Sequence, residues 1–265
     1  MSDALPASAP PGPRKRRVWP WVLLGVVVLL ALAALAADAL VRGLAEKAIA
    51  QEVATALEVP AGTDVEVRIG GGSVLVQALA GGLDRVDVGI DELTLGPLTG
   101  DLAIVARGVP LDPAAPTREL AVRYAIPGDA LDGLTPEITG VTIDDVALEG
   151  SEVVATGGVS FLGMSLDLGL GLTPSAVEGD LAFDPTSIRI GDTTLTADEL
   201  RGNVLFGGLA DRLLQQRRVC IADELPAALT LTGLRVEGSE LVATLDGSGA
   251  AIGGDAFQQK GVCAA

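Results

Sequence analysis

Residues 18–37 form an uninterrupted apolar run of twenty residues without a single charge. At a helical rise of ~1.5 Å per residue the run is roughly 30 Å long, which matches the hydrocarbon core of a bilayer. Aromatic rings that favour the headgroup region stand at its start, and a basic cluster directly precedes it. The residues that define this membrane anchor are Arg14, Lys15, Arg16, Arg17, Trp19 and Trp21.

This pattern predicts a single-pass anchor at residues 18–37, a disordered, proline-rich cytoplasmic tail at residues 1–17, and an extracytoplasmic domain at residues 38–265. The orientation follows because basic clusters are retained on the cytoplasmic side. The alternative is a signal peptide cleaved after the small residues at 34–36, which would leave a secreted or periplasmic protein. Both alternatives place the domain outside the cytoplasm.

The helix is expected to continue beyond the membrane. Residues 38–58 contain no proline, and apolar side chains recur there at helical spacing until Pro60 and Gly62. Such a helix has an apolar stripe that needs a cover, and the remaining chain predicts a sheet that supplies one.

The first half of this remaining chain alternates between apolar and polar positions, which is typical of strands with one wet face. The pattern predicts strands at residues 65–69, 83–90, 93–95, 98–107 and 120–126, and a proline-rich connection at 111–116. Between the first two strands, Ser73 is expected to cap a short helix at residues 74–80. Leu75, Val76 and Leu79 form one apolar face of that helix.

The second half contains an internal repeat. Residues 146–156 match residues 234–244, and each copy has the form of a β-hairpin around a Glu-Gly-Ser-Glu turn. The two copies indicate either two similar β-rich halves or two equivalent hairpins of one sheet. Further strands are predicted at residues 164–172, 176–183 and 187–194, and a helix at residues 208–219. The predicted fold is therefore α+β, with a largely antiparallel, curved β-sheet body and one or two helices besides the N-terminal one.

The net charge and the aromatic content limit the classes of molecule that this protein can bind. The whole chain has a net charge of −17, and removing the basic residues at 14–17 and Asp3 leaves 14 basic against 34 acidic residues in the exported part, a net of −20. Such a surface repels phosphate backbones, so we expect no nucleic-acid partner. Aromatic residues make up 3% of the chain, which disfavours surfaces that stack bases or sugars.

Two cysteines, Cys220 and Cys263, both lie in the exported part. In an oxidising compartment such a pair predicts a disulfide. Free or metal-binding thiols are the alternative, but the chain has no histidine and no further cysteine. We therefore expect no metal site and no cofactor.

No catalytic residues are predicted, because a chain without histidine lacks every Ser-His-Asp and Cys-His arrangement. Asp87, Asp91 and Glu92 could seat a calcium ion, although a solvated strand and turn explain them more simply. Abundant carboxylates leave one enzymatic alternative, a carboxylate-pair glycan hydrolase. A second alternative is a non-catalytic envelope scaffold that binds protein partners.

A curved sheet over apolar helices also creates room for an aliphatic groove that holds acyl chains. We expect two apolar segments to form its edges, residues 74–83 and 205–214, although each of their side chains could instead fill the core. The lipid-binding candidates are Val74, Leu75, Leu79, Leu83, Leu205, Phe206, Leu209 and Leu213.

The order of these segments resembles the LmeA-like phospholipid-binding proteins of the actinobacterial cell envelope. The resemblance rests on the anchor running into an Ala-rich helix, on residues 67–70, 74–79 and 81–88, on Gly108-Val109, and on residues 224–229 before the final hairpin. Members of that family often carry Pro-Phe-Leu where this chain has Ser73-Val74-Leu75. The resemblance implies a membrane phospholipid as partner, a role in lipid or lipoglycan assembly or maintenance, no catalytic residues, and an α+β body with a hydrophobic cavity, similar to tubular lipid-binding domains.

Overall fold

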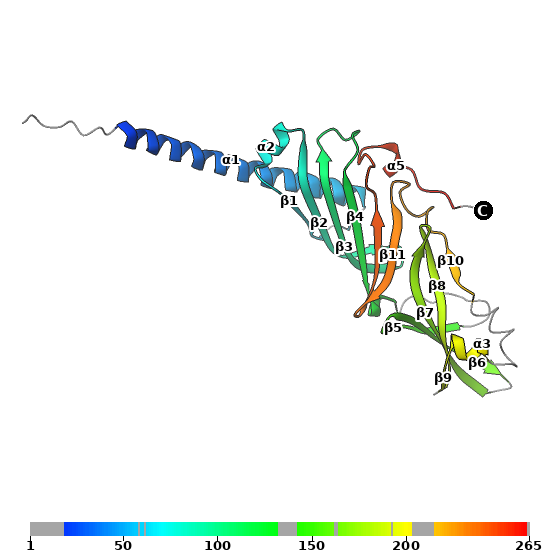
Figure 1. The fold of residues 1–265 in the computed structure, drawn as a ribbon. Coiled ribbons are helices and arrows are strands. Elements are labelled where there is room, and N and C mark those ends of the chain that lie inside the picture. The colour runs from blue at the N-terminus through cyan, green and yellow to red at the C-terminus, as the bar shows by residue number, and fades with distance from the viewer. Residues whose placement is uncertain are drawn as a thin grey trace, which may run out of the picture.

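The computed structural model describes residues 19–57, 59–60, 62–131, 142–161, 164–191, 193–202 and 215–263. A long N-terminal helix, α1 (Trp19–Ala56), leads into a body of two antiparallel sheets (Figure 1). The second sheet lies beyond the first, at the end of the molecule away from the start of α1. The predicted α+β class is confirmed, and the strands that the structure describes close no barrel.

The helix α1 is continuous across the expected boundary at residue 38, as its alanine-rich, proline-free sequence predicts. Its section Leu23–Ala56 is the one described helix long and apolar enough to cross a membrane, and its most apolar stretch of 18 residues has a mean hydropathy of 2.6. Near its C-terminal end α1 contacts the body, where Ile49, Ala50 and Val53 pack against the core of the first sheet. The predicted use of the sheet as a cover for the helix is thereby confirmed.

The first sheet has the strand order β1-β2-β3-β4-β12-β11. Its strands are β1 (Val65–Gly70), β2 (Gly82–Leu95), β3 (Leu98–Pro110), β4 (Glu119–Pro127), β12 (Glu240–Asp246) and β11 (Thr230–Glu237). The short helix α2 (Val74–Leu79) connects β1 to β2, and Ser73 caps it by accepting a hydrogen bond from the backbone N–H of Val76. The predicted capped helix is therefore present.

One long strand replaces two predicted ones in this sheet. The expected break between residues 90 and 93 is an irregularity inside β2, where the register with β3 shifts. Glu92 has a φ of 53°, and its backbone N–H donates a hydrogen bond to the Asp101 carboxylate. The Asp101 carboxylate thus supports the bulge, and no described cluster of three or more acidic or cysteine side chains could hold a metal ion.

The second sheet has the order β10-β8-β7-β6-β5, with β9 paired to β8. Its strands are β5 (Thr142–Glu149), β6 (Glu152–Phe161), β7 (Met164–Val177), β8 (Asp180–Ile190), β9 (Thr193–Thr196) and β10 (Arg217–Val219). Four short helical segments complete the described fold: α2, η1 (Gly128–Leu131), α3 (Ala197–Gly202) and α5 (Asp255–Gln258).

Three sequence-based predictions fail in this sheet. The predicted strand 176–183 is split by a turn at Glu178-Gly179, and the predicted strand 187–194 is split by a turn at Gly191. The end of the predicted helix 208–219 is instead strand β10, because its backbone pairs with β8. Residues 208–214 of that prediction lie outside the described residues.

The two repeated segments are β-hairpins, as predicted, and they belong to different sheets. Gly150 and Gly238 occupy matching turn positions with φ values of 62° and 63°, a left-handed conformation that glycine adopts without strain. The backbone N–H of Gly128 in η1 donates to the carbonyl of Ser239, which ties the second hairpin to the junction of the sheets. The alternative of two equivalent hairpins in one sheet is therefore wrong.

Candidate functional site

A single apolar cluster runs through both sheets and defines the candidate binding region. Its buried members include Val86, Ile90 and Tyr124 in the first sheet and Val146 and Val153 in the second. Many apolar side chains around these members are only partly buried, among them Leu83, Ile104, Val109, Leu148, Ala176, Leu181, Ile221, Leu225, Leu229, Val236 and Leu241. A closed sandwich would bury such residues, so this core has an incompletely covered apolar border.

A pocket of ≈ 390 Å³ opens where this border meets the junction of the two sheets. Its walls come from the turn between β7 and β8, from the segment before β11, and from the C-terminal segment. The apolar lining residues are Ala222, Leu225, Ala227, Leu229, Leu231 and Val262. The volume lies within the ~300–1,000 Å³ range of small-molecule sites, so the pocket has room for an apolar group.

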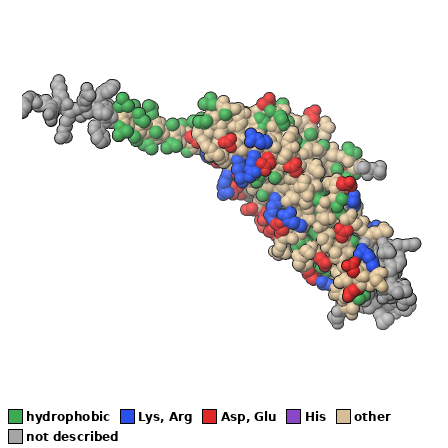
Figure 2. Space-filling model, viewed as in Figure 1, with side chains coloured by type: hydrophobic (Ala, Val, Ile, Leu, Met, Phe, Trp, Pro, Cys, Tyr) green, Lys and Arg blue, Asp and Glu red, His purple; other side chains and the backbone are tan. Residues whose placement is uncertain are grey.

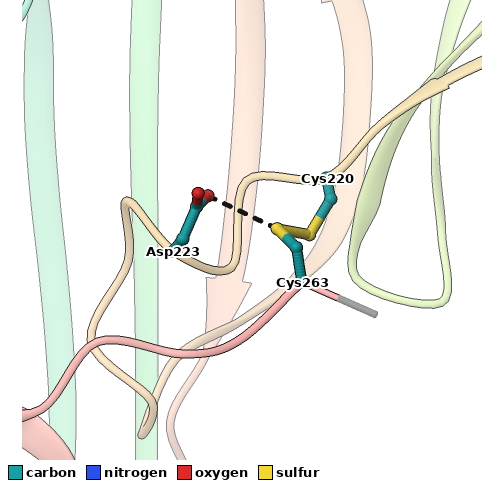
Figure 3. The surroundings of a disulfide bond; sticks show 3 residues. All are labelled: Cys220, Asp223 and Cys263. Atoms are coloured by element: carbon teal, nitrogen blue, oxygen red, sulfur yellow. Dashed lines mark hydrogen bonds between the residues drawn. A yellow bond between two sulfur atoms is a disulfide. The ribbon is translucent and has the colours of Figure 1, made fainter. Parts of the chain in front are cut away.

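The predicted disulfide is present and forms one wall of the pocket. Cys220 and Cys263 are bonded, with a Cα–Cα distance of 5.8 Å (Figure 3). Cys220 also lines the pocket. The carboxylate of Asp223 lies 3.4 Å from the sulfur of Cys263. The bond joins the C-terminal segment to the segment that precedes β11, across 43 positions of the chain, and backbone hydrogen bonds such as that from the N–H of Gly261 to the carbonyl of Leu225 join the same two segments.

Acidic side chains line the pocket on its β7–β8 side. Glu178 and Asp180 both line it, and Arg218 of β10 donates a hydrogen bond of 2.9 Å to the Glu178 carboxylate. The guanidinium and carboxylate are thus already paired across the edge of the second sheet. An apolar floor with a charged rim suits a ligand that has an apolar part and a polar part.

Among the predicted lipid-binding residues, those of the segment 74–83 lie at the other edge of the first sheet. Val74 is buried, Leu83 packs partly exposed against the core cluster, and Leu75 and Leu79 are exposed. The structure does not bring these four side chains to the pocket beside β11. The remaining candidates, Leu205, Phe206, Leu209 and Leu213, lie outside the described residues, as do Arg14, Lys15, Arg16 and Arg17.

Sequence reasoning did not identify the pocket residues of the segment 220–231. The available signal was the pair of cysteines, which indicates that this segment is held against the C-terminus. Periodicity gave no further help, because residues 220–229 form turns and one isolated bridge rather than a regular element.

The fold and the pocket define a class of protein: an α+β body with an open pocket that aliphatic side chains line in part, carried on a long apolar helix. Figure 2 shows the apolar surface along the first part of α1 and the mixed acidic and basic side chains over the sheets. The chain belongs to the LmeA-like phospholipid-binding family, whose model matches residues 36–246. No curated protein and no solved structure matches the chain.

Proposed function

We propose that this protein is a membrane-anchored, extracytoplasmic phospholipid-binding protein that holds acyl chains along the aliphatic border between its two sheets. Residues 18–37 would form the anchor, residues 1–17 a cytoplasmic tail, and residues 38–265 the lipid-binding domain. The proposed role is to support lipid or lipoglycan assembly or maintenance in the cell envelope. The binding needs neither a metal nor a cofactor, and no catalytic step.

The observation that carries this proposal is the ≈ 390 Å³ pocket at the edge of a core cluster that extends through both sheets. Leu225, Leu229 and Leu231 belong to the pocket and also to that cluster, so an acyl chain in the pocket would contact the existing core. Burying an aliphatic chain is favourable by roughly 0.8 kcal/mol per CH₂, which favours a lipid over a polar ligand at this place.

The proposed anchor is supported by the apolar, wholly unburied section of α1 that precedes the body. A tether of this kind holds the pocket near its source of lipid and raises the effective lipid concentration without a strong surface patch. Val74 and Leu83 remain proposed as one edge of the lipid-binding region, and Leu205, Phe206, Leu209 and Leu213 as another.

Native mass spectrometry of the full chain, purified in a lipid-free detergent and incubated with phospholipid, tests the proposal. We expect a protein–phospholipid adduct of one to one. Ala227→Trp should reduce this adduct strongly, because the indole fills the pocket that Ala227 lines. Ala121→Trp is the matched control, since Ala121 lies exposed on β4 outside the pocket.

The outcome also separates the alternatives. A scaffold would give no adduct with either variant or with the unmodified chain, which would refute lipid binding. A carboxylate-pair hydrolase would instead lose glycan cleavage when single Asp or Glu residues are replaced, with its lipid content unchanged. Equal adducts for Ala227→Trp and Ala121→Trp would keep lipid binding but move it away from this pocket.

A further inference from the structure

The helix α2 turns its apolar face outward. Leu75, Val76 and Leu79 are 36%, 64% and 90% exposed, whereas the residues that it buries are Val74 and Gln77. A short helix normally buries its apolar stripe and exposes its amide, so this arrangement is the reverse of the usual one. Such a cluster of exposed aliphatic side chains on one element marks a surface that contacts something apolar.

The buried amide of Gln77 fixes this orientation. Its Nε2 donates hydrogen bonds of 3.2 Å to the carbonyls of Gly70 and Gly72, and its Oε1 accepts a hydrogen bond of 2.8 Å from the backbone N–H of Asp84. The amide therefore joins the end of β1 to the start of β2 beneath α2. Rotating α2 to bury its leucines would leave these backbone groups without their partner, so the exposed face is built into the fold.

The helix α2 is also fixed at a defined level along α1. The carboxylate of Asp38 accepts hydrogen bonds from Ser73 Oγ at 2.7 Å and from the backbone N–H of Leu75 at 3.0 Å. Arg42, one turn further along α1, donates a hydrogen bond of 2.7 Å to the carbonyl of Gly72. Asp38 is the first charged residue after the apolar run 18–37, so α2 begins level with the end of that run.

This level coincides with the headgroup layer of a bilayer that α1 crosses. The six residues of α2 span about 9 Å, and the headgroup region adds about 5–8 Å to each side of the hydrocarbon core. Figure 1 shows α2 at the end of the body where α1 enters it, beside β1, the edge strand of the first sheet.

We propose that α2 is a second membrane contact, and that Leu75, Val76 and Leu79 insert into the boundary between headgroups and acyl chains of the bilayer. This inference rests on the proposed function, since it takes α1 as the membrane anchor. One helix alone lets the body swivel and tilt, whereas two contacts fix its orientation. The first sheet then meets the bilayer at its β1 edge, and the pocket beside β11 lies at the opposite edge of that sheet.

Depth-dependent quenching in the full chain tests this proposal. Leu79→Cys, labelled with an environment-sensitive fluorophore, reports on α2, and the native Cys220–Cys263 disulfide is retained. Leu32→Cys reports on the apolar run, and Thr194→Cys on the exposed strand β9 of the second sheet. The protein is reconstituted into vesicles of phosphatidylcholine and phosphatidylglycerol that carry a spin label either on the headgroup or deep in the acyl chain.

We expect the headgroup quencher to remove most of the emission of the label at position 79, and the deep quencher to remove most of the emission of the label at position 32. Neither quencher should reduce the emission of the label at position 194. Adding Val76→Asp to the position-79 reporter should remove its quenching, because a carboxylate opposes insertion. Leu95→Asp is the matched control, since Leu95 is an exposed leucine at the turn between β2 and β3 and should leave the quenching unchanged.

Three results would overturn the proposal in distinguishable ways. Quenching at position 32 without quenching at position 79 would show an anchored protein whose α2 does not touch the bilayer. Absence of quenching at both positions would refute the anchoring in the proposed function and the role of α2 with it. If position 79 is instead protected from an aqueous quencher only at high protein concentration, its partner is a second copy of the chain and the bilayer contact is refuted.

Discussion

The hydroxyl of Ser73 donates a hydrogen bond of 2.7 Å to the carboxylate of Asp38, across 35 positions of the chain. The same oxygen accepts a hydrogen bond of 3.3 Å from the backbone N–H of Val76 in the first turn of α2. One serine thus caps the short helix and joins it to α1. Six residues alone are too few for a stable helix in water, so α2 depends on such tertiary contacts.

Replacing Ser73 by alanine should loosen α2 without unfolding the sheets. Loss of an N-cap costs about 1 kcal/mol, so amide exchange at residues 74–79 should accelerate by about fivefold. Hydrogen exchange followed by mass spectrometry measures this effect on the full chain. Ser151→Ala, at the exposed turn of the β5–β6 hairpin, is the control, and equal protection in both variants would show that the cap is dispensable.

Tyr124 holds the bulged end of β2 and should be sensitive to loss of its hydroxyl. Its Oη donates to the carbonyls of Leu93 at 2.8 Å and Leu98 at 3.1 Å, and its ring is buried in the core. Tyr124→Phe should lower the free energy of unfolding by about 1–2 kcal/mol, because buried acceptors lose their donor. Urea denaturation measures the change, with Thr194→Val on the exposed strand β9 as a reference expected to stay near the unmodified protein.

The same residue predicts an alkaline limit to stability. Burial raises the pKa of Tyr124 above its ordinary value of 10.0. A group with a raised folded-state pKa contributes fully below the unfolded pKa, and that contribution is lost as the pH rises through the folded pKa. We therefore expect the unfolding midpoint to decrease as the pH rises above about 10. This decrease should be less steep in Tyr124→Phe than in the unmodified protein. If the unfolding midpoint decreases equally steeply above pH 10 in both proteins, groups other than Tyr124 cause the loss of stability.

An acid limit follows from the ion pairs on the outer faces of the sheets. Hydrogen bonds from Arg123, and then from Arg235, lower the pKa of Glu237, and the Arg189 hydrogen bond lowers the pKa of Glu149. Carboxylates with a lowered folded-state pKa stabilise the protein above their unfolded pKa, near 4.3, and this stabilisation is lost as the pH falls through the folded value.

Arg123→Gln should therefore lower the unfolding midpoint at pH 7 and leave it nearly unchanged at pH 2, where the carboxylates are protonated. Thermal unfolding at both pH values measures the difference. Lys260→Gln removes a more exposed pair, with Glu224, and should change neither midpoint. An equal loss at both pH values in Arg123→Gln would mean that the arginine acts through packing.

The elements that the sequence predicts well are those whose pattern is local. The apolar run and the helical spacing after it specify α1, and the Glu-Gly-Ser-Glu turns specify the two repeated hairpins. The failures have non-local causes. Glu178 lies in a turn with a φ of 56°, a left-handed conformation that usually belongs to glycine, so its residue type does not signal the turn. Arg217–Val219 is a strand because its backbone pairs with the edge of β8.

The candidate site was harder to predict for a similar reason. The pattern of α2 suggests that its leucines face inward, whereas Gln77 lies inside because its amide matches three backbone groups that only the folded chain brings together. The pocket beside β11 is likewise lined by turns that the disulfide holds in place. Neither arrangement leaves a periodic signal along the chain.

The disulfide should stabilise the pocket and not only the chain. Closing a loop of this size is worth about 4 kcal/mol on the loop-entropy model. We expect a Cys220→Ala, Cys263→Ala variant to unfold at a lower temperature and to lose phospholipid adducts in native mass spectrometry, since the walls at Cys220 and Val262 separate. Reductant should leave the unfolding temperature of the variant unchanged, whereas it should lower the unfolding temperature of the unmodified protein toward that of the variant. Full lipid loading in the variant would show that the pocket does not need the crosslink.

The edge strand β1 is protected by two side chains of α1, and their removal should cause self-association. Glu46 accepts a hydrogen bond of 2.9 Å from the backbone N–H of Ile69, and Arg42 donates to the carbonyl of the same residue. An unprotected edge presents free backbone groups to any other strand, and covering it is a common way to prevent such pairing. The Arg42→Ala, Glu46→Ala double variant should therefore form concentration-dependent oligomers through β1, with the mass measured by light scattering on the full chain in detergent. Lys47→Ala, Glu52→Ala alters the same helix at exposed positions and should remain like the unmodified protein. If both double variants keep the unmodified mass at high concentration, the edge is protected by the helix backbone rather than by these two side chains.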